Sequence, residues 1–110
     1  MPIFLLAPRE DALGDPDWEA SLHVGPCLVA AADEGSARRY ADCAFCRAVI
    51  ERRPGQSRLP ASPWSQPRLV RAEAIADPRL LGEELPEGFV KACSRTGVPV
   101  TVRAPAAPPH

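Results

Sequence analysis

The chain has 110 residues and a formal net charge of −1, because 13 Lys and Arg residues face 14 Asp and Glu residues. This length fits one domain with one modest core, and the near-neutral charge gives no bulk attraction to nucleic acid or to an anionic membrane. The N-terminal apolar run is too short for a signal peptide, and no stretch approaches the length of a membrane span. We therefore expect a soluble, cytoplasmic protein with no membrane contact.

Short strands are predicted in the first third of the chain. Residues 3–7 form a continuous apolar run that ends at Pro8, which is typical of a buried strand. Between Trp18 and Val24 apolar and polar residues alternate, and this predicts a half-buried strand. Gly25-Pro26 is a turn signal, and residues 27–32 return as a third strand. The second and third strands are therefore expected to pair as a hairpin.

The one long helical pattern covers residues 33–53. Asp33 is the expected N-cap, and Glu34 is spaced for an ion pair with Arg38 one turn later. Pro54-Gly55 is the expected end of the helix. Apolar residues recur at helical spacing and share one face: Ala37, Tyr40, Ala41, Ala44, Phe45, Ala48 and Val49.

The second half of the chain carries weaker patterns. Residues 69–75 alternate and predict a fourth strand. Asp77-Pro78 begins what we expect to be a single helical turn over residues 77–81. Residues 85–97 are ambiguous, but their apolar spacing favours a short helix. The alternating valines of residues 98–102 predict a last strand, which Pro99 would hold at a sheet edge.

One amphipathic helix with a single apolar face needs a sheet to cover. The elements therefore predict an α+β fold in the order β-β-β-α-β-(α)-β. In this two-layer sandwich the main helix packs on a small, mostly antiparallel sheet. We expect a single domain over residues 1–103 and a disordered Pro/Ala tail over residues 104–110.

Cys43 and Cys46 form a Cys-x-x-Cys pair on the side of the helix away from its apolar face. An accessible dithiol of this kind would serve redox chemistry or supply half of a metal site. The pair lies two to three turns inside the predicted helix, however, and not at the N-terminus, where the helix dipole lowers a thiol pKa. His23 and Cys27 are badly placed to complete a metal site. We expect no metal and no cofactor, and we keep a thiol function as an alternative.

Other catalytic arrangements are poorly supported. A nucleophilic cysteine needs a histidine base, and the two histidines fall on the outer face of a predicted strand (His23) and in the tail (His110). Glu83, Glu84 and Glu87 share a loop with no sign of the burial that a general acid requires. The sequence leans away from an enzyme, although a site assembled from several elements or subunits stays open.

Three residues are candidates for contact with a partner. Arg39 and Arg47 belong to a basic side of the helix, but acidic residues interrupt it and no aromatic residue is interleaved to stack on bases, so nucleic acid is not favoured. A solvent-exposed, salt-bridged face explains them better than a nucleic-acid surface does. Trp64 lies in a proline-flanked loop and is either a surface anchor for a partner or a plug for the core. We expect a protein partner, and a homodimer stays open.

The stretch from Gly25 to Arg38 reads GPCLVAAADEGSAR. Over about residues 18–50 the chain resembles the core of HicB-type antitoxins, in which a strand, a Pro/Gly/Cys turn, a second strand and an acidic, alanine-rich helix start recur. The resemblance implies a small protein that binds and blocks a partner. The chain lacks that family's acidic-proline lead-in and any DNA-binding helix or ribbon. The expected function is a non-catalytic interaction or regulatory module, with thiol or antitoxin-like functions as alternatives.

Overall fold

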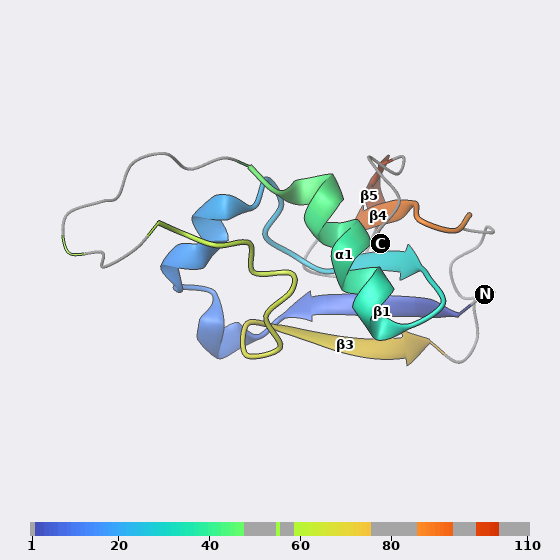
Figure 1. Cartoon of the computed structure of the whole chain (residues 1–110), viewed down its shortest axis with the longest axis horizontal. Coiled ribbons are helices and arrows are strands. Elements are labelled where there is room, and N and C mark those ends of the chain that lie inside the picture. The colour runs from blue at the N-terminus through green and yellow to red at the C-terminus, as the bar shows by residue number, and fades with distance from the viewer. Residues whose placement is uncertain (1, 48–54, 56–58, 76–85, 94–98, 104–110) are drawn as a thin grey trace.

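The computed structural model describes residues 2–47, 55, 59–75, 86–93 and 99–103. Within them, five antiparallel strands form one sheet in the order β3-β1-β2-β4-β5, and the helix α1 (Glu34–Phe45) packs on one face of the sheet (Figure 1). The predicted α+β architecture is thereby confirmed. The strands are β1 (Ile3–Pro8), β2 (Cys27–Ala30), β3 (Val70–Ile75), β4 (Val90–Cys93) and β5 (Pro99–Arg103).

The start of α1 follows the local sequence. Asp33 is extended, and its Oδ1 accepts a hydrogen bond of 2.7 Å from the backbone N–H of Ser36, which makes Asp33 the N-cap. Arg38 Nε lies 3.1 Å from a carboxylate oxygen of Glu34. The predicted cap and the predicted ion pair are both confirmed.

The helix ends at Phe45, eight residues before the predicted end at Arg53, and residues 48–54 lie outside the described part. Cys46 is already extended, because the backbone around it pairs with another segment. The N–H of Leu22 donates to the carbonyl of Phe45 at 2.7 Å, and the N–H of Arg47 donates to the carbonyl of Ala20 at 2.9 Å. A tertiary backbone pairing thus ends the helix at Phe45.

The predicted strand over residues 18–24 is wrong, and so is the hairpin built on it. Its first residues belong to a short 3-10 helix, η2 (Pro16–Ala20), and β2 pairs with β1 and β4 instead. Asp15 caps this helix by accepting 2.9 Å from the N–H of Asp17, and Pro16 occupies its first position. Trp18 and Ala20 are buried as predicted, but Leu22 and Val24 are exposed.

The predicted helix over residues 85–97 is also wrong where the structure describes it, because residues 90–93 form β4. This strand lies between β2 and β5, and all four of its residues are buried. A strand covered on both faces loses the alternation that identifies a half-buried strand. β5 confirms the predicted last strand. The predicted turn over residues 77–81 and the predicted tail over residues 104–110 lie outside the described residues.

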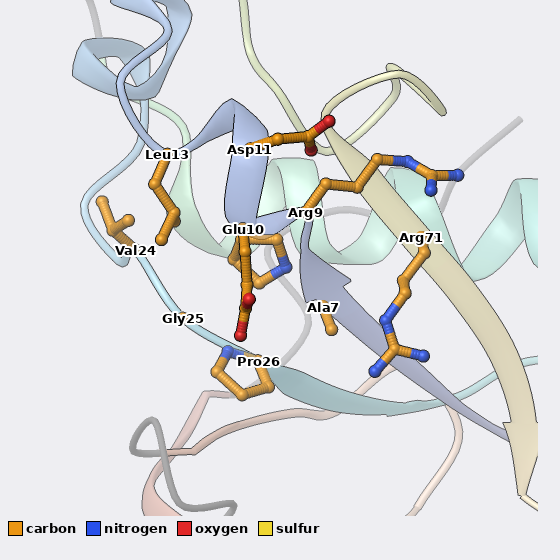
Figure 2. A pocket seen from close by; sticks show the side chains of 10 residues that line it. Ala7, Arg9, Glu10, Asp11, Leu13, Val24, Gly25, Pro26 and Arg71 are labelled. Carbon is orange, nitrogen blue, oxygen red and sulfur yellow. The ribbon is translucent and has the colours of Figure 1, made fainter.

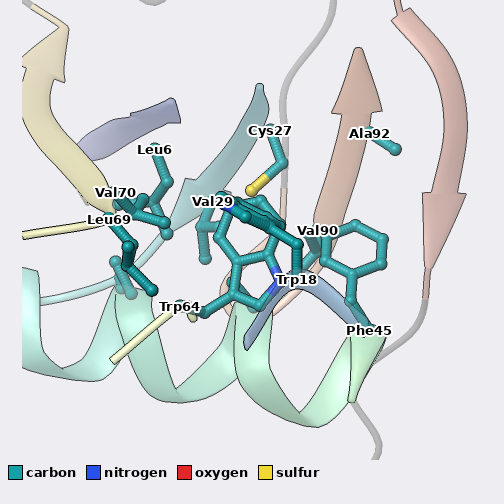
Figure 3. Packing of buried hydrophobic residues seen from close by; sticks show 13 residues of the cluster. Leu6, Trp18, Cys27, Val29, Phe45, Trp64, Leu69, Val70, Val90 and Ala92 are labelled. Atoms are coloured by element: carbon teal, nitrogen blue, oxygen red, sulfur yellow. The ribbon is translucent and has the colours of Figure 1, made fainter. Parts of the chain in front are cut away.

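The main core fills the space between α1 and the sheet (Figure 3). The helix contributes mostly small residues there, with Ala37 and Ala41 fully buried, so bulk has to come from elsewhere. Trp64 supplies it from the loop before β3. The centroid of its ring lies 5.6 Å from that of Trp18, with the two rings edge to face, and 5.3 Å from that of Phe45. A smaller buried cluster, which includes residues of β1, β2 and β4, completes the interior.

Arg38 ties the loop that carries Trp64 to the helix. Its guanidinium group is buried and donates to the carbonyl oxygen of Trp64 at 3.1 Å and to that of Val70 at 3.0 Å. These two bonds join α1 to the loop and to the start of β3. Arg38, predicted only as the ion-pair partner of Glu34, is therefore also part of the interior.

Candidate functional site

An open cleft of about 800 Å³ lies where β1 ends (Figure 2). Three segments line it. The first runs from the end of β1 through the short 3-10 helix η1 (Glu10–Ala12) to residue 13. The other two are residues 24–26, which lead into β2, and Arg71 on β3. The cleft is thus built from segments far apart in the sequence. Its lining residues are Ala7, Pro8, Arg9, Glu10, Asp11, Leu13, Val24, Gly25, Pro26 and Arg71.

The first wall is anchored through Arg9. Its backbone N–H donates to the carbonyl of Leu69 at 2.9 Å, and its Nε donates to the carbonyl of Pro67 at 2.8 Å. The exposed residues Glu10 and Asp11 follow directly. Figure 2 shows the carboxylate of Glu10 directed toward the opposite wall at Pro26, whereas that of Asp11 points away from it.

The second wall is held by the aromatic core. Trp64 Nε1–H donates to Ser21 Oγ at 2.9 Å, and this hydroxyl donates to the carbonyl of His23 at 2.7 Å. The His23 ring stacks on that of Trp64, with a centroid distance of 6.4 Å, and lies 5.0 Å from that of Phe45. Its Nε2 is 3.0 Å from the carbonyl of Pro26, which only accepts, so Nε2 is the protonated nitrogen. The burial of Trp64 therefore fixes this wall.

Gly25 is closely packed in the second wall. A Cβ at this position would lie 3.1 Å from the His23 ring and 3.3 Å from the carbonyl oxygen of Cys93. Next to it, Val24 lines the cleft with 48% of its surface exposed. The wall thus presents an exposed apolar side chain from a tightly packed backbone.

Charges of both signs surround the apolar part of the cleft. Arg71 Nη1 lies 3.3 Å from a carboxylate oxygen of Glu73, but both side chains are more than half exposed, so solvent screens the pair and it holds Arg71 only weakly. No cysteine or histidine is among the described residues that line the cleft. Its groups are suited to bind apolar and charged side chains of a ligand.

The structure does not bring Cys43 and Cys46 into this cleft. Both are exposed, one in the last turn of α1 and the other at its C-cap. Desolvation raises the pKa of Cys46, and the neighbouring Asp42 and Cys43 raise it further. The C-terminal end of a helix also disfavours a thiolate. These effects oppose the lowered pKa of a reactive thiol.

The other two cysteines are buried. Burial raises the pKa of Cys27 well above its usual value and also raises that of Cys93, although the charge of Lys91 partly offsets the effect on Cys93. Within the described residues, no three His, Cys, Asp or Glu side chains gather to hold a metal ion.

The predicted contact residues lie apart from one another. Arg39 is exposed on α1, where its Nη2 is 3.4 Å from Ser36 Oγ, and Arg47 is exposed just beyond the helix. Trp64 is fully buried and presents no surface to a partner, so its place is that of the core plug. Val24 and Arg71 were not among the predicted contact residues. Val24 was assigned to an inward face, and only the fold shows that both residues line one cleft.

Comparison with protein-family models, curated proteins and solved structures finds no match to this chain. The resemblance to HicB-type antitoxins has no support beyond the residues that suggested it, and residues 18–30 do not form the hairpin on which it depended. Among the helices of the described residues, none is long and apolar enough to cross a membrane.

Proposed function

We propose that the protein is a non-catalytic interaction module that binds an extended segment of a partner protein in the cleft. The observation that carries the proposal is the exposed Val24 side chain, which lies in the cleft with Leu13 and Pro26 and has Arg9 and Arg71 nearby. Protein interfaces combine an apolar centre with a polar rim, and arginine is enriched in them.

An extended protein segment suits this cleft better than an enclosed small molecule. The cleft is open, and its charged residues Arg9, Glu10, Asp11 and Arg71 are all exposed. A ligand that stays partly in solvent therefore meets both signs of charge at the rim while an apolar side chain contacts Val24. A cytoplasmic location belongs to the same proposal, and the free state of all four cysteines supports it.

Two matched variants test the proposal. Val24→Asp places a carboxylate in the apolar part of the cleft, whereas Leu59→Asp places one on a side chain of similar exposure, 43%, that does not line it. Peptides are selected from a random phage-displayed library on the unaltered protein, and their affinities for the three proteins are measured by calorimetry.

Val24→Asp is expected to weaken binding at least about tenfold, because a carboxylate buried against an apolar side chain lacks partners. Leu59→Asp should bind as the unaltered protein does, and both variants should retain the parent's circular dichroism. The proposal fails if no peptide is enriched, or if the two variants bind the selected peptides equally well.

A further inference from the structure

The strand β3 forms one edge of the sheet, since β1 is its only partner among the described strands. The N–H of Arg9 donates to the carbonyl of Leu69, so this pair of opposed residues is hydrogen-bonded. Such pairs alternate along an antiparallel ladder, and the next ones in the observed register are Ala7 with Arg71 and Leu5 with Glu73. The backbone groups of Ala72 and Ala74 therefore point outward from the sheet.

None of the described residues pairs with the outward edge of β3 from Ala72 onward. At Val70 the carbonyl already accepts from Arg38, and the N–H donates to the carbonyl of Gln66. Ala72 and Ala74 have small side chains, and Ala74 is exposed. A further strand would thus find a free donor and a free acceptor at each of these two alanines.

β3 carries exposed charges of opposite sign, one on Arg71 and one on Glu73, so two antiparallel copies of the strand can pair them. Val70 and Ala72 pack with the core under α1, so the alternation of the strand places Arg71 and Glu73 together on the other face. We propose that β3 pairs in antiparallel fashion with β3 of a second copy of this chain, with Ala72 opposite Ala72 of the partner subunit. Arg71 then lies opposite Glu73 of the partner subunit, and the two-fold axis repeats this pair.

Charge also selects this register over its neighbours. The two β3 strands can shift past each other only in steps that keep outward-pointing residues opposite outward-pointing residues. The two neighbouring registers therefore place odd-numbered residues of β3 opposite each other in new combinations. One shift puts Glu73 opposite Glu73 of the partner subunit, and the other puts Arg71 opposite Arg71 of the partner subunit. Like charges directly opposite each other destabilise a strand pair, whereas opposite charges stabilise it. In the proposed register both ion pairs occupy non-hydrogen-bonded positions, where side chains are closest.

The pairing is short, with two backbone hydrogen bonds between the Ala72 residues and two ion pairs. We therefore expect a weak, reversible dimer that depends on protein concentration and on salt. The inference is independent of the ligand proposed for the cleft. It does bring Glu73 of the partner subunit next to Arg71, which lines the cleft.

Sedimentation velocity of the full chain over a range of concentrations tests the dimer. Glu73→Arg turns both attractive pairs into repulsive ones and should raise the dissociation constant about 30-fold. The double exchange R71E/E73R recreates the opposed charges with unchanged net charge and should restore the parent's constant to within about threefold.

A second variant tests the backbone edge separately. Ala72→Pro removes the outward N–H and leaves both charges and the pairing with β1 in place, a substitution that edge strands tolerate. It should weaken the dimer while the circular dichroism of the monomer stays unchanged. The proposal is overturned by a protein that is monomeric up to about 1 mM, or by a dimer that neither Glu73→Arg nor Ala72→Pro weakens.

Discussion

Arg38 offers the sharpest test of how the fold is held together, and Arg38→Met is the informative change. Methionine keeps much of the apolar stem but leaves the carbonyls of Trp64 and Val70 without their buried donor. An unsatisfied buried polar group costs about 1–3 kcal/mol. The ion pair with Glu34 adds at most about 0.5 kcal/mol, because the Glu34 side chain is 55% exposed. With two carbonyls affected, we therefore expect a loss of about 2–6 kcal/mol in the free energy of unfolding.

Urea unfolding, followed by tryptophan fluorescence and by far-ultraviolet circular dichroism, measures this loss. The melting temperature should fall by about 10 °C or more. Glu34→Gln is the matched control, since it removes the ion pair and leaves the bonds to both carbonyls of Trp64 and Val70 in place, and it should change stability by less than about 0.5 kcal/mol. If Arg38→Met and Glu34→Gln are equally stable, the two carbonyl bonds do not hold the loop and the reasoning is refuted.

Three further outcomes are expected. Gly25→Ala should cost about 1–3 kcal/mol in urea unfolding, because its Cβ crowds the His23 ring, and a neutral effect would contradict this. In a Cys43→Ser background, Cys46 should react slowly with iodoacetamide at neutral pH and faster above pH ~9, since its pKa is raised; rapid labelling at pH ~7 would contradict it. Asp33→Ala should lower the melting temperature near neutral pH, with the difference shrinking once acid protonates the carboxylate.

The direction of the pKa shift of Asp33 determines how its stabilising effect changes with pH. Hydrogen bonds from Ser36 lower the pKa of the folded state below the usual value of 3.8. The unfolded chain therefore binds a proton first as the pH falls, so the stabilisation is fully present above the unfolded pKa. It disappears as the pH drops through the folded pKa. A difference between parent and variant that persists unchanged in strong acid would mean that the cap acts through packing and not through charge.

Local signals in the sequence predicted the parts of the fold that local interactions determine. The cap at Asp33 and its ion-paired neighbours need only residues within one turn, and both are present. The apolar run of β1 and the alternation of β3 also predicted strands correctly. The single apolar face of the helix was enough to imply a sheet beneath it.

The two main errors, the strand over residues 18–24 and the length of the helix, have different causes. The alternation from Trp18 onward resembles a strand, but the capped start at Asp15 and the hydrogen bond from Trp18 Nε1 to the carbonyl of Ala12 favour a 3-10 helix. The helix ends at Phe45 because residues 20–22 pair with its last carbonyl and the residues after it. The first error therefore had a local signal against it, Asp15-Pro16 at the start of η2, whereas the pairing that ends α1 has no counterpart in the neighbouring sequence. The cleft could not be predicted for the same reason, since its walls meet only after folding.

Arg71 belongs to both proposed surfaces, because it lines the cleft and also lies on the open edge of β3. A substitution of Arg71 alone would therefore disturb peptide binding and dimerisation together. It could not show whether the cleft and the edge of β3 act separately. Val24 lies in the cleft away from the edge, and the backbone N–H of Ala72 points out of the edge and is not part of the cleft lining. If Val24→Asp loses the peptide and still dimerises, while Ala72→Pro keeps the peptide and becomes monomeric, the two surfaces act separately. If each variant loses both properties, the partner subunit completes the cleft through its Glu73.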